Sequence, residues 1–158
     1  MIVELAHKEI VQVAQYIIDS WKKPLKQNVL SCVGFTSIES LKQLYAKIKP
    51  TVKRVLNLIS AEPTSNSQRD ALSFLKRYIR GLDDDKLVKF LRYCTGATMV
   101  CVDSIQVTFT NVDGMARRPV AHTCGSILEL PTTYQSFPQF REEINNIFNS
   151  QYWDIDIC

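Results

Sequence analysis

The hydrophobic pattern of this chain changes its period once, and that change limits the folds that the chain can adopt. Up to Gly96 the apolar residues recur at spacings of three and four, which is typical of helices with one buried face. After Gly96 they alternate, so that Ile105, Val107 and Phe109 face one way and the polar residues between them face the other. We therefore expect an α+β protein, with a helical N-terminal segment followed by a small mixed α+β domain that contains a short sheet.

Capping residues and prolines divide the helical part into segments. Helices are expected over residues 3–21, 25–32, 36–48, 51–59, 67–80, 83–95 and 137–148. Thr36 with Glu39, and Ser67 with Asp70, have the spacing of helix caps. The run of aspartates at 83–85 is assigned to a helix start, where carboxylates favour the positive end of the backbone dipole, and not to a metal.

One linker-like run and one turn complete the predicted organisation. Residues 61–67 favour turns and lack core-forming residues, so the predicted division is a helical segment 1–60, a linker 61–67 and a domain 68–158. Residues 111–114 (Asn-Val-Asp-Gly) predict a hairpin turn after the strand that contains Val107. Leu128 and Leu130 alternate as a further strand, which Pro131 ends.

The stretch from 119 to 131 contains the residues that best suit chemistry. Cys124 is followed by Gly125 and Ser126, small residues that leave its sulfur accessible. If residues 119–124 are extended, His122 and Cys124 point to the same side, which brings an imidazole beside a thiol. With His122, two nearby cations would raise the thiolate fraction of the cysteine: Arg117 and Arg118. Because free cysteines are also common buried apolar residues, the pattern alone leaves a structural thiol open.

The residues around Cys124 resemble the active-site segment of the C-terminal lobe of HECT ubiquitin-protein ligases. The resemblance rests on residues 121–124 (Ala-His-Thr-Cys), residues 128–131 (Leu-Glu-Leu-Pro) and Tyr134. Residues 89–96 are similar to the family's helix that ends in Thr-Gly, and residues 137–148 to its late helix. The resemblance covers residues 70–158.

This resemblance implies a ubiquitin transferase that needs no cofactor. In HECT ligases the matching cysteine accepts ubiquitin as a thioester from a ubiquitin-conjugating enzyme and passes it to a lysine of a protein substrate. Cys124 would be this acceptor, with His122 and Thr123 shaping the loop around it. One alternative is a non-catalytic module that keeps the fold and binds ubiquitin or another partner. A second is a cysteine hydrolase, for which no Asp or Asn partner of His122 can be assigned.

Both ends of the sequence depart from the family pattern. HECT domains have a large N-terminal lobe that docks the conjugating enzyme, and residues 1–60 correspond at most to its final helices, so we expect that docking lobe to be missing from this sequence. The family's tail carries an aromatic anchor and an acidic residue implicated in lysine attack. In this tail Trp153 or Ile155 would be the anchor and Asp154 or Asp156 the acid, and the sequence does not choose between them.

Composition argues against several other classes. The net charge of +3 is too small to indicate a nucleic-acid partner, although residues 1–80 hold 13 Lys or Arg against 6 Asp or Glu. The isolated glycines form no phosphate loop, and the cysteines and histidines lack the paired spacing of zinc sites, so we expect no metal. No apolar run has the length of a membrane span. Five cysteines without a secretory signal indicate a reducing compartment, the cytoplasm or the nucleus.

Overall fold

The structure of the chain is a computed structural model that describes residues 13–24 and 37–150. The chain divides into two compact units, Met1–Lys47 and Ile48–Cys158. None of the described helices has the length and apolar character that a membrane crossing requires.

The first unit contains two helices, and most of their described apolar side chains are exposed. The helices are α2 (Val13–Pro24) and α3 (Ile38–Ile48), the second of which ends just past the boundary of the unit. The described residues of the expected inward stripes are not buried, since Trp21 is 64% exposed and Ile38 is 74% exposed. An amphipathic pattern shows which face of a helix would be covered and not what covers it, which explains the difference. Ser37 caps α3 through its hydroxyl, which accepts from the Ser40 N–H at 3.1 Å. The cap expected at Thr36 and the helix expected over 25–32 lie outside the described residues.

Three of the four described helices of the second unit begin at a side chain that accepts a backbone hydrogen bond, and α7 (Phe137–Asn149) instead has Pro138 in its first turn. The other three are α4 (Val52–Leu58), α5 (Asn66–Arg80) and α6 (Asp84–Thr95). Ser65 and Gln68 form the capping box of α5, two residues earlier than the cap expected at Ser67. Asp83 caps α6 by accepting from the Lys86 N–H at 2.9 Å, which confirms the assignment of the aspartate run to a helix start. Gly96 then ends α6 in the left-handed conformation, with φ +73°.

Four strands form one sheet in the order β1-β2-β4-β3. They are β1 (Ile59–Ser60), β2 (Ile105–Thr110), β3 (Val120–His122) and β4 (Ile127–Pro131). β2 lies parallel to both β1 and β4, and β3 pairs with β4 in the antiparallel direction. The hairpin predicted at 111–114 is therefore wrong, because β4 lies between β2 and β3. The chain leaves β2 through a 3-10 turn, Gly114–Ala116, instead of returning beside it.

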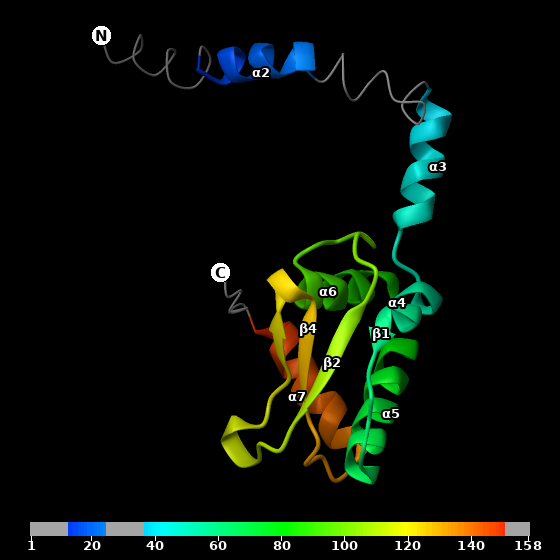
Figure 1. Cartoon of the computed structure of the whole chain (residues 1–158), viewed down its shortest axis with the longest axis vertical. Coiled ribbons are helices and arrows are strands. Elements are labelled where there is room, and N and C mark those ends of the chain that lie inside the picture. Colours follow the sequence, from blue (N-terminus) through cyan, green and yellow to red (C-terminus); the bar gives the residue numbers. More distant parts are fainter. Residues whose placement is uncertain (1–12, 25–36, 151–158) are drawn as a thin grey trace, which may run out of the picture. The chain divides into compact units, whose positions relative to one another are not determined.

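The sheet has one covered face and one open face, as the alternation predicts. Ile105 and Val107 of β2 and Leu128 and Leu130 of β4 are buried against the helices. In Figure 1, α7 lies behind β2 and β4, and α5 lies at the β1 edge, so the helices cover one side of the sheet. The side chains at alternate positions, such as Gln106, stay on the uncovered side. The α+β fold expected from the change of period is confirmed.

The run at 61–67 lies inside the second unit. Val55 of α4 is fully buried and β1 belongs to the sheet, so both elements pack with the residues that follow them. The turn-forming residues of the run end β1 and cap α5 at Ser65. Their composition signals a change of element and not a change of domain, and the compact units separate instead at Lys47.

One arginine ties the β2–β3 connection to α7. The guanidinium of Arg117 donates to Glu143 through Nη2 at 2.6 Å and Nε at 3.1 Å, and its Nη1 donates to Asp113 at 3.2 Å. It also lies over the ring of Tyr134, 5.0 Å from the centroid. The Arg117 side chain is only 10% exposed, and Glu143 raises its pKa through the hydrogen bond. This contact therefore joins elements that are far apart in the sequence. The charged guanidinium group in it is largely shielded from water.

We predict that Glu143→Ala lowers the free energy of unfolding by about 1–3 kcal/mol, because a largely buried guanidinium loses its bidentate partner. Glu142→Ala is the matched control, since the neighbouring side chain on α7 is exposed and should change stability by less than about 0.5 kcal/mol. Urea unfolding followed by circular dichroism measures both variants. Equal effects of the two substitutions would show that the Arg117 contact adds nothing to stability.

Candidate functional site

Cys124 lies at the tip of a β-hairpin. A 3-10 turn, Thr123–Gly125, joins β3 to β4, whose nearest paired residues are His122 and Ile127. Ser126 closes the turn in the left-handed conformation, with φ 49°, and its N–H donates to the Thr123 carbonyl at 3.3 Å. Cys124 is a free thiol and is exposed. The hairpin thus presents an accessible sulfur at the end of the sheet where α6 also ends (Figure 1).

Neighbouring elements hold the backbone of this turn. The N–H of Gln106, at the start of β2, donates to the Ser126 carbonyl at 2.9 Å. A Cβ placed on Gly96 would lie 3.7 Å from the Cβ of Thr123, so the end of α6 packs against the turn. A Cβ on Gly125 would lie 3.1 Å from the Ile127 side chain, which leaves little room for a larger residue. The turn therefore keeps its backbone fixed while the sulfur stays accessible.

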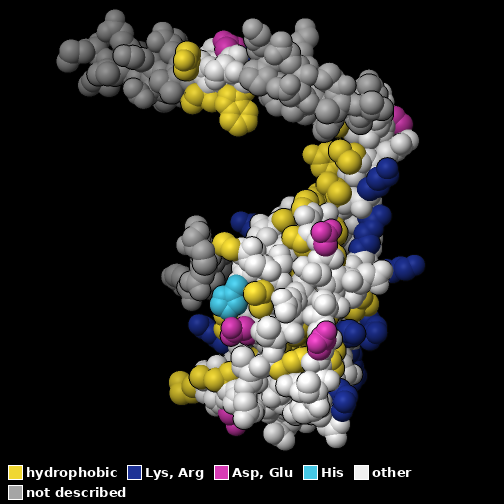
Figure 2. Space-filling model, viewed as in Figure 1, with side chains coloured by type: hydrophobic (Ala, Val, Ile, Leu, Met, Phe, Trp, Pro, Cys, Tyr) yellow, Lys and Arg dark blue, Asp and Glu magenta, His cyan; other side chains and the backbone are white. Residues whose placement is uncertain are grey.

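His122 is bound to a carboxylate and not to the thiol. Its Nε2 lies 3.1 Å from Oε1 of Glu129, and both side chains are 41% exposed. Figure 2 shows the histidine (cyan) beside an acidic side chain on the open face of the sheet. Among the described residues no hydrogen bond joins His122 to Cys124. The expected extended run ends at His122 because the 3-10 turn begins at Thr123, so the simple alternation argument for a common side does not apply to Cys124.

Sequence reasoning missed Glu129 as the partner of His122. The cause is the incorrect hairpin, which placed β3 beside β2. The strand–turn–strand spacing of residues 120–131 contains the signal, since a short turn at 123–126 pairs β3 with β4 and sets the two side chains diagonally on one face.

Among the other candidate residues, one lies in the turn beside Cys124, one is bound to another element, and four lie outside the described residues. Arg117, which was expected to act on the cysteine, is engaged by Glu143. Thr123 lies in the turn itself. The four candidate tail residues lie outside the described part of the chain: Trp153, Asp154, Ile155 and Asp156. Within the described part, no group of three or more His, Cys, Asp or Glu residues could hold a metal ion.

The described thiols differ in their access to solvent. Cys94 is fully buried in α6, and burial raises the pKa of its thiol. Cys101 is exposed, as Cys124 is. Because the thiolate is the nucleophile, the buried thiol is chemically protected while the two exposed thiols are open to reaction.

We predict that brief treatment of the folded protein with iodoacetamide alkylates Cys124 and Cys101 and leaves Cys94 unmodified. Peptide mass spectrometry identifies the modified cysteines, and the same treatment in guanidinium chloride, which should modify all three, is the control. Modification of Cys94 in the folded protein as fast as Cys124 would contradict the buried position of its thiol.

Comparison with known proteins is consistent with this arrangement. The family model described as HECT-domain (ubiquitin-transferase) matches residues 1–151, which include the hairpin that carries Cys124 and also the helices before it. A search of the curated proteins finds no match. Since the family model spans most of the sequence and the α+β fold agrees with the lobe that the cysteine motif resembles, the chain belongs to the HECT-domain (ubiquitin-transferase) family.

Proposed function

We propose that Cys124 accepts ubiquitin as a thioester and passes it to a lysine of a protein substrate. One observation carries the proposal: in a chain of the HECT-domain family, an exposed free thiol occupies the tip of a hairpin whose backbone is held by α6 and β2. The family works with ubiquitin, a conjugating enzyme and substrates, and these are the partners that we propose for this chain.

The proposed thioester exchange requires little of the site other than correct positioning of the reacting atoms. In the first step the Cys124 thiolate attacks the carbonyl carbon of the thioester on the conjugating enzyme, a new C–S bond forms, and the thiolate of the conjugating enzyme leaves. In the second step a lysine amine attacks the new thioester, loses a proton and displaces the Cys124 thiolate. One thiolate replaces another in the first step, so the exchange is nearly balanced and its rate depends on bringing the reacting atoms together.

His122 and Thr123 fit positioning roles in this proposal. Thr123 packs against Gly96 at the end of α6, and the His122–Glu129 pair bridges β3 and β4 below the turn. Both contacts stabilise the geometry of the hairpin and neither touches the sulfur. They would affect the reaction through the position of Cys124.

A non-catalytic binding module is the second candidate. It is favoured by the absence, among the described contacts, of any base hydrogen-bonded to Cys124, since His122 is engaged by Glu129. The same observation weighs against a cysteine hydrolase, because amide hydrolysis requires a base in contact with the nucleophile. Thioester exchange has no such requirement, and for that reason we place the transferase first.

We predict that Cys124→Ala abolishes the ubiquitin adduct that is cleaved by reducing agents, while Cys101→Ala, which removes the other exposed thiol, leaves it intact. Cys124→Ser is expected to give at most an oxyester that resists reduction, because a hydroxyl is a poorer nucleophile without a base. Non-reducing gels of the chain with conjugating enzyme and ubiquitin measure the adduct. No adduct on the unmodified protein favours the binding module, and full charging of the alanine variant would refute the role of Cys124.

The tail should act in the second step more than in the first. If Trp153 or Ile155 anchors the tail near the hairpin and Asp154 or Asp156 assists the amine, deletion of residues 153–158 slows transfer to lysine more than it slows loading of Cys124. Single-turnover assays that follow loading and discharge separately measure the two rates, with a thermal melt of the shortened chain as the control for folding. Equal loss in both steps would count against an acid in the tail.

A further inference from the structure

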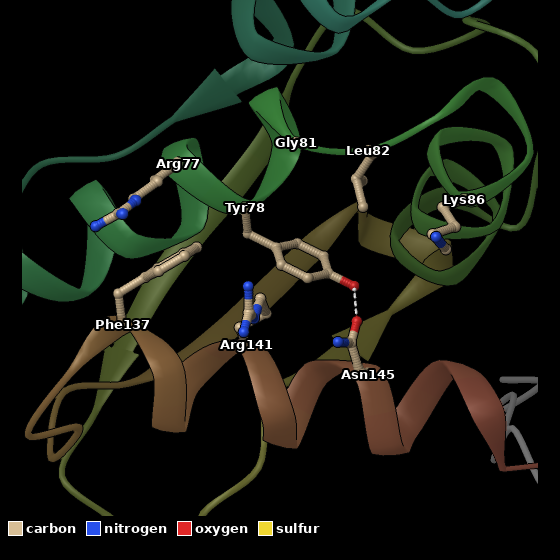
Figure 3. A pocket seen from close by; sticks show the side chains of 8 residues that line it. All are labelled: Arg77, Tyr78, Gly81, Leu82, Lys86, Phe137, Arg141 and Asn145. Atoms are coloured by element: carbon tan, nitrogen blue, oxygen red, sulfur yellow. Dashed lines mark hydrogen bonds between the residues drawn. The ribbon is translucent and has the colours of Figure 1, made fainter.

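We propose that a basic hollow among α5, α6 and α7 binds an acidic segment of a partner protein. The hollow has a volume of about 330 Å³ and lies on the helical side of the second unit. Three cations line it: Arg77 of α5, Lys86 of α6 and Arg141 of α7. Figure 3 shows Arg77 beside Phe137, Arg141 below Tyr78, and Lys86 at the opposite end from Arg77.

The two arginines are not neutralised by carboxylates. The guanidinium of Arg77 stacks on Phe137, with Cζ 4.1 Å from the ring centroid, which leaves its N–H groups available to a ligand. Neither Arg77 nor Arg141 forms an ion pair with a described carboxylate. Lys86 pairs with Asp83 at 2.9 Å, but both side chains are more than half exposed, so this pair is weak and can be exchanged. The three cations of the lining therefore outnumber the one described carboxylate paired with them, that of Asp83, so the hollow has a net positive charge.

The floor of the hollow adds a neutral donor in a fixed orientation. The phenol of Tyr78 donates to Oδ1 of Asn145 at 2.8 Å, which leaves the Asn145 amide nitrogen available to donate to a ligand. Burial raises the pKa of Tyr78 to about 12, so the phenol stays protonated at neutral pH and the hydrogen bond keeps this direction. The amide is therefore aligned before any ligand arrives.

The size of the hollow and the spread of its charges favour a peptide over a small anion. One phosphate would fill only a fraction of the volume and could not meet cations at both ends, across the Tyr78 ring (Figure 3). An extended segment with acidic side chains at two places could pair with the arginines at one end and Lys86 at the other. Leu82 and Phe137 would contact the stems of those side chains. Arginine clusters recognise acidic segments in this way, through bidentate pairs with carboxylates.

Binding at the hollow is independent of the thiol chemistry. Lys86 belongs to the first turn of α6, whereas the Cys124 turn packs against Gly96 at its other end. About ten residue steps of helix, from Lys86 to Gly96, separate the two places by roughly 15 Å at 1.5 Å of rise per residue. A segment held in the hollow would not contact the sulfur, so Cys124→Ala should bind it as the unmodified chain does.

Fluorescence anisotropy with a fluorescein-labelled peptide rich in Asp and Glu tests the proposal. We expect saturable binding to the full chain and none of the same peptide with Asn and Gln in place of the acids. The double variant Arg77→Gln with Arg141→Gln should weaken binding by about tenfold or more, because both charge-assisted pairs between the arginines and the peptide carboxylates are lost. Lys86→Gln should weaken it by about two- to fivefold. Thermal melts check that each variant folds.

Arg80→Gln with Arg92→Gln is the matched control, because it removes the same charge from exposed positions of α5 and α6 outside the hollow. Its binding should change by less than about twofold if the hollow is the site. Equal loss in the two double variants, or displacement of the peptide by an equal concentration of inorganic phosphate, would overturn the proposal. Binding that appears only after removal of residues 151–158 would also overturn it, by assigning the hollow to the acidic tail of this chain.

Discussion

The position of β4 between β2 and β3 is the arrangement on which the candidate site depends. β4 pairs with β2 from Ile127 to Pro131, and it pairs with β3 across the hairpin. Leu128 and Leu130 bury this strand against the helices, which places it at the centre of the sheet. Both ends of the Cys124 turn therefore continue paired strands, so the sheet holds the turn in place while the Cys124 side chain remains exposed.

The strand that enters the turn is held at its start by two helices. The Tyr93 phenol, on α6, donates to the Pro119 carbonyl at 2.7 Å, just before β3 begins. Burial raises the pKa of Tyr93 to about 12, so this donor keeps its proton at neutral pH. Arg117, two residues earlier, is bound to Glu143 on α7. A strand of only three residues buries little surface, and these polar contacts fix its path where hydrophobic burial alone would not.

The sequence predicted what depends on local pattern and missed what depends on pairing. Period and capping located α6, α7 and the alternation of β2, because a helix and the two faces of a strand are set by neighbours in the chain. The order of the strands is set by contacts between residues far apart in the sequence. The residues at 111–114 therefore do not predict that β4 lies between β2 and β3. That error hid the His122–Glu129 pair. The motif around Cys124 is local, and it predicted the accessible thiol that the structure has. The sequence did not predict the hydrogen bonds around that thiol.

The geometry of the hairpin favours transfer over hydrolysis for a physical reason. Thioester exchange requires an accessible sulfur with a fixed backbone, and the turn supplies both without a base in contact with Cys124. A histidine hydrogen-bonded to the sulfur would also activate water near the thioester, and that water would hydrolyse the thioester before transfer. The contact of His122 with Glu129 holds the imidazole on the open face of the sheet, within the hairpin's own hydrogen-bonding pattern. If Cys124 forms the proposed thioester, this separation of histidine from thiol protects the thioester until an amine attacks it.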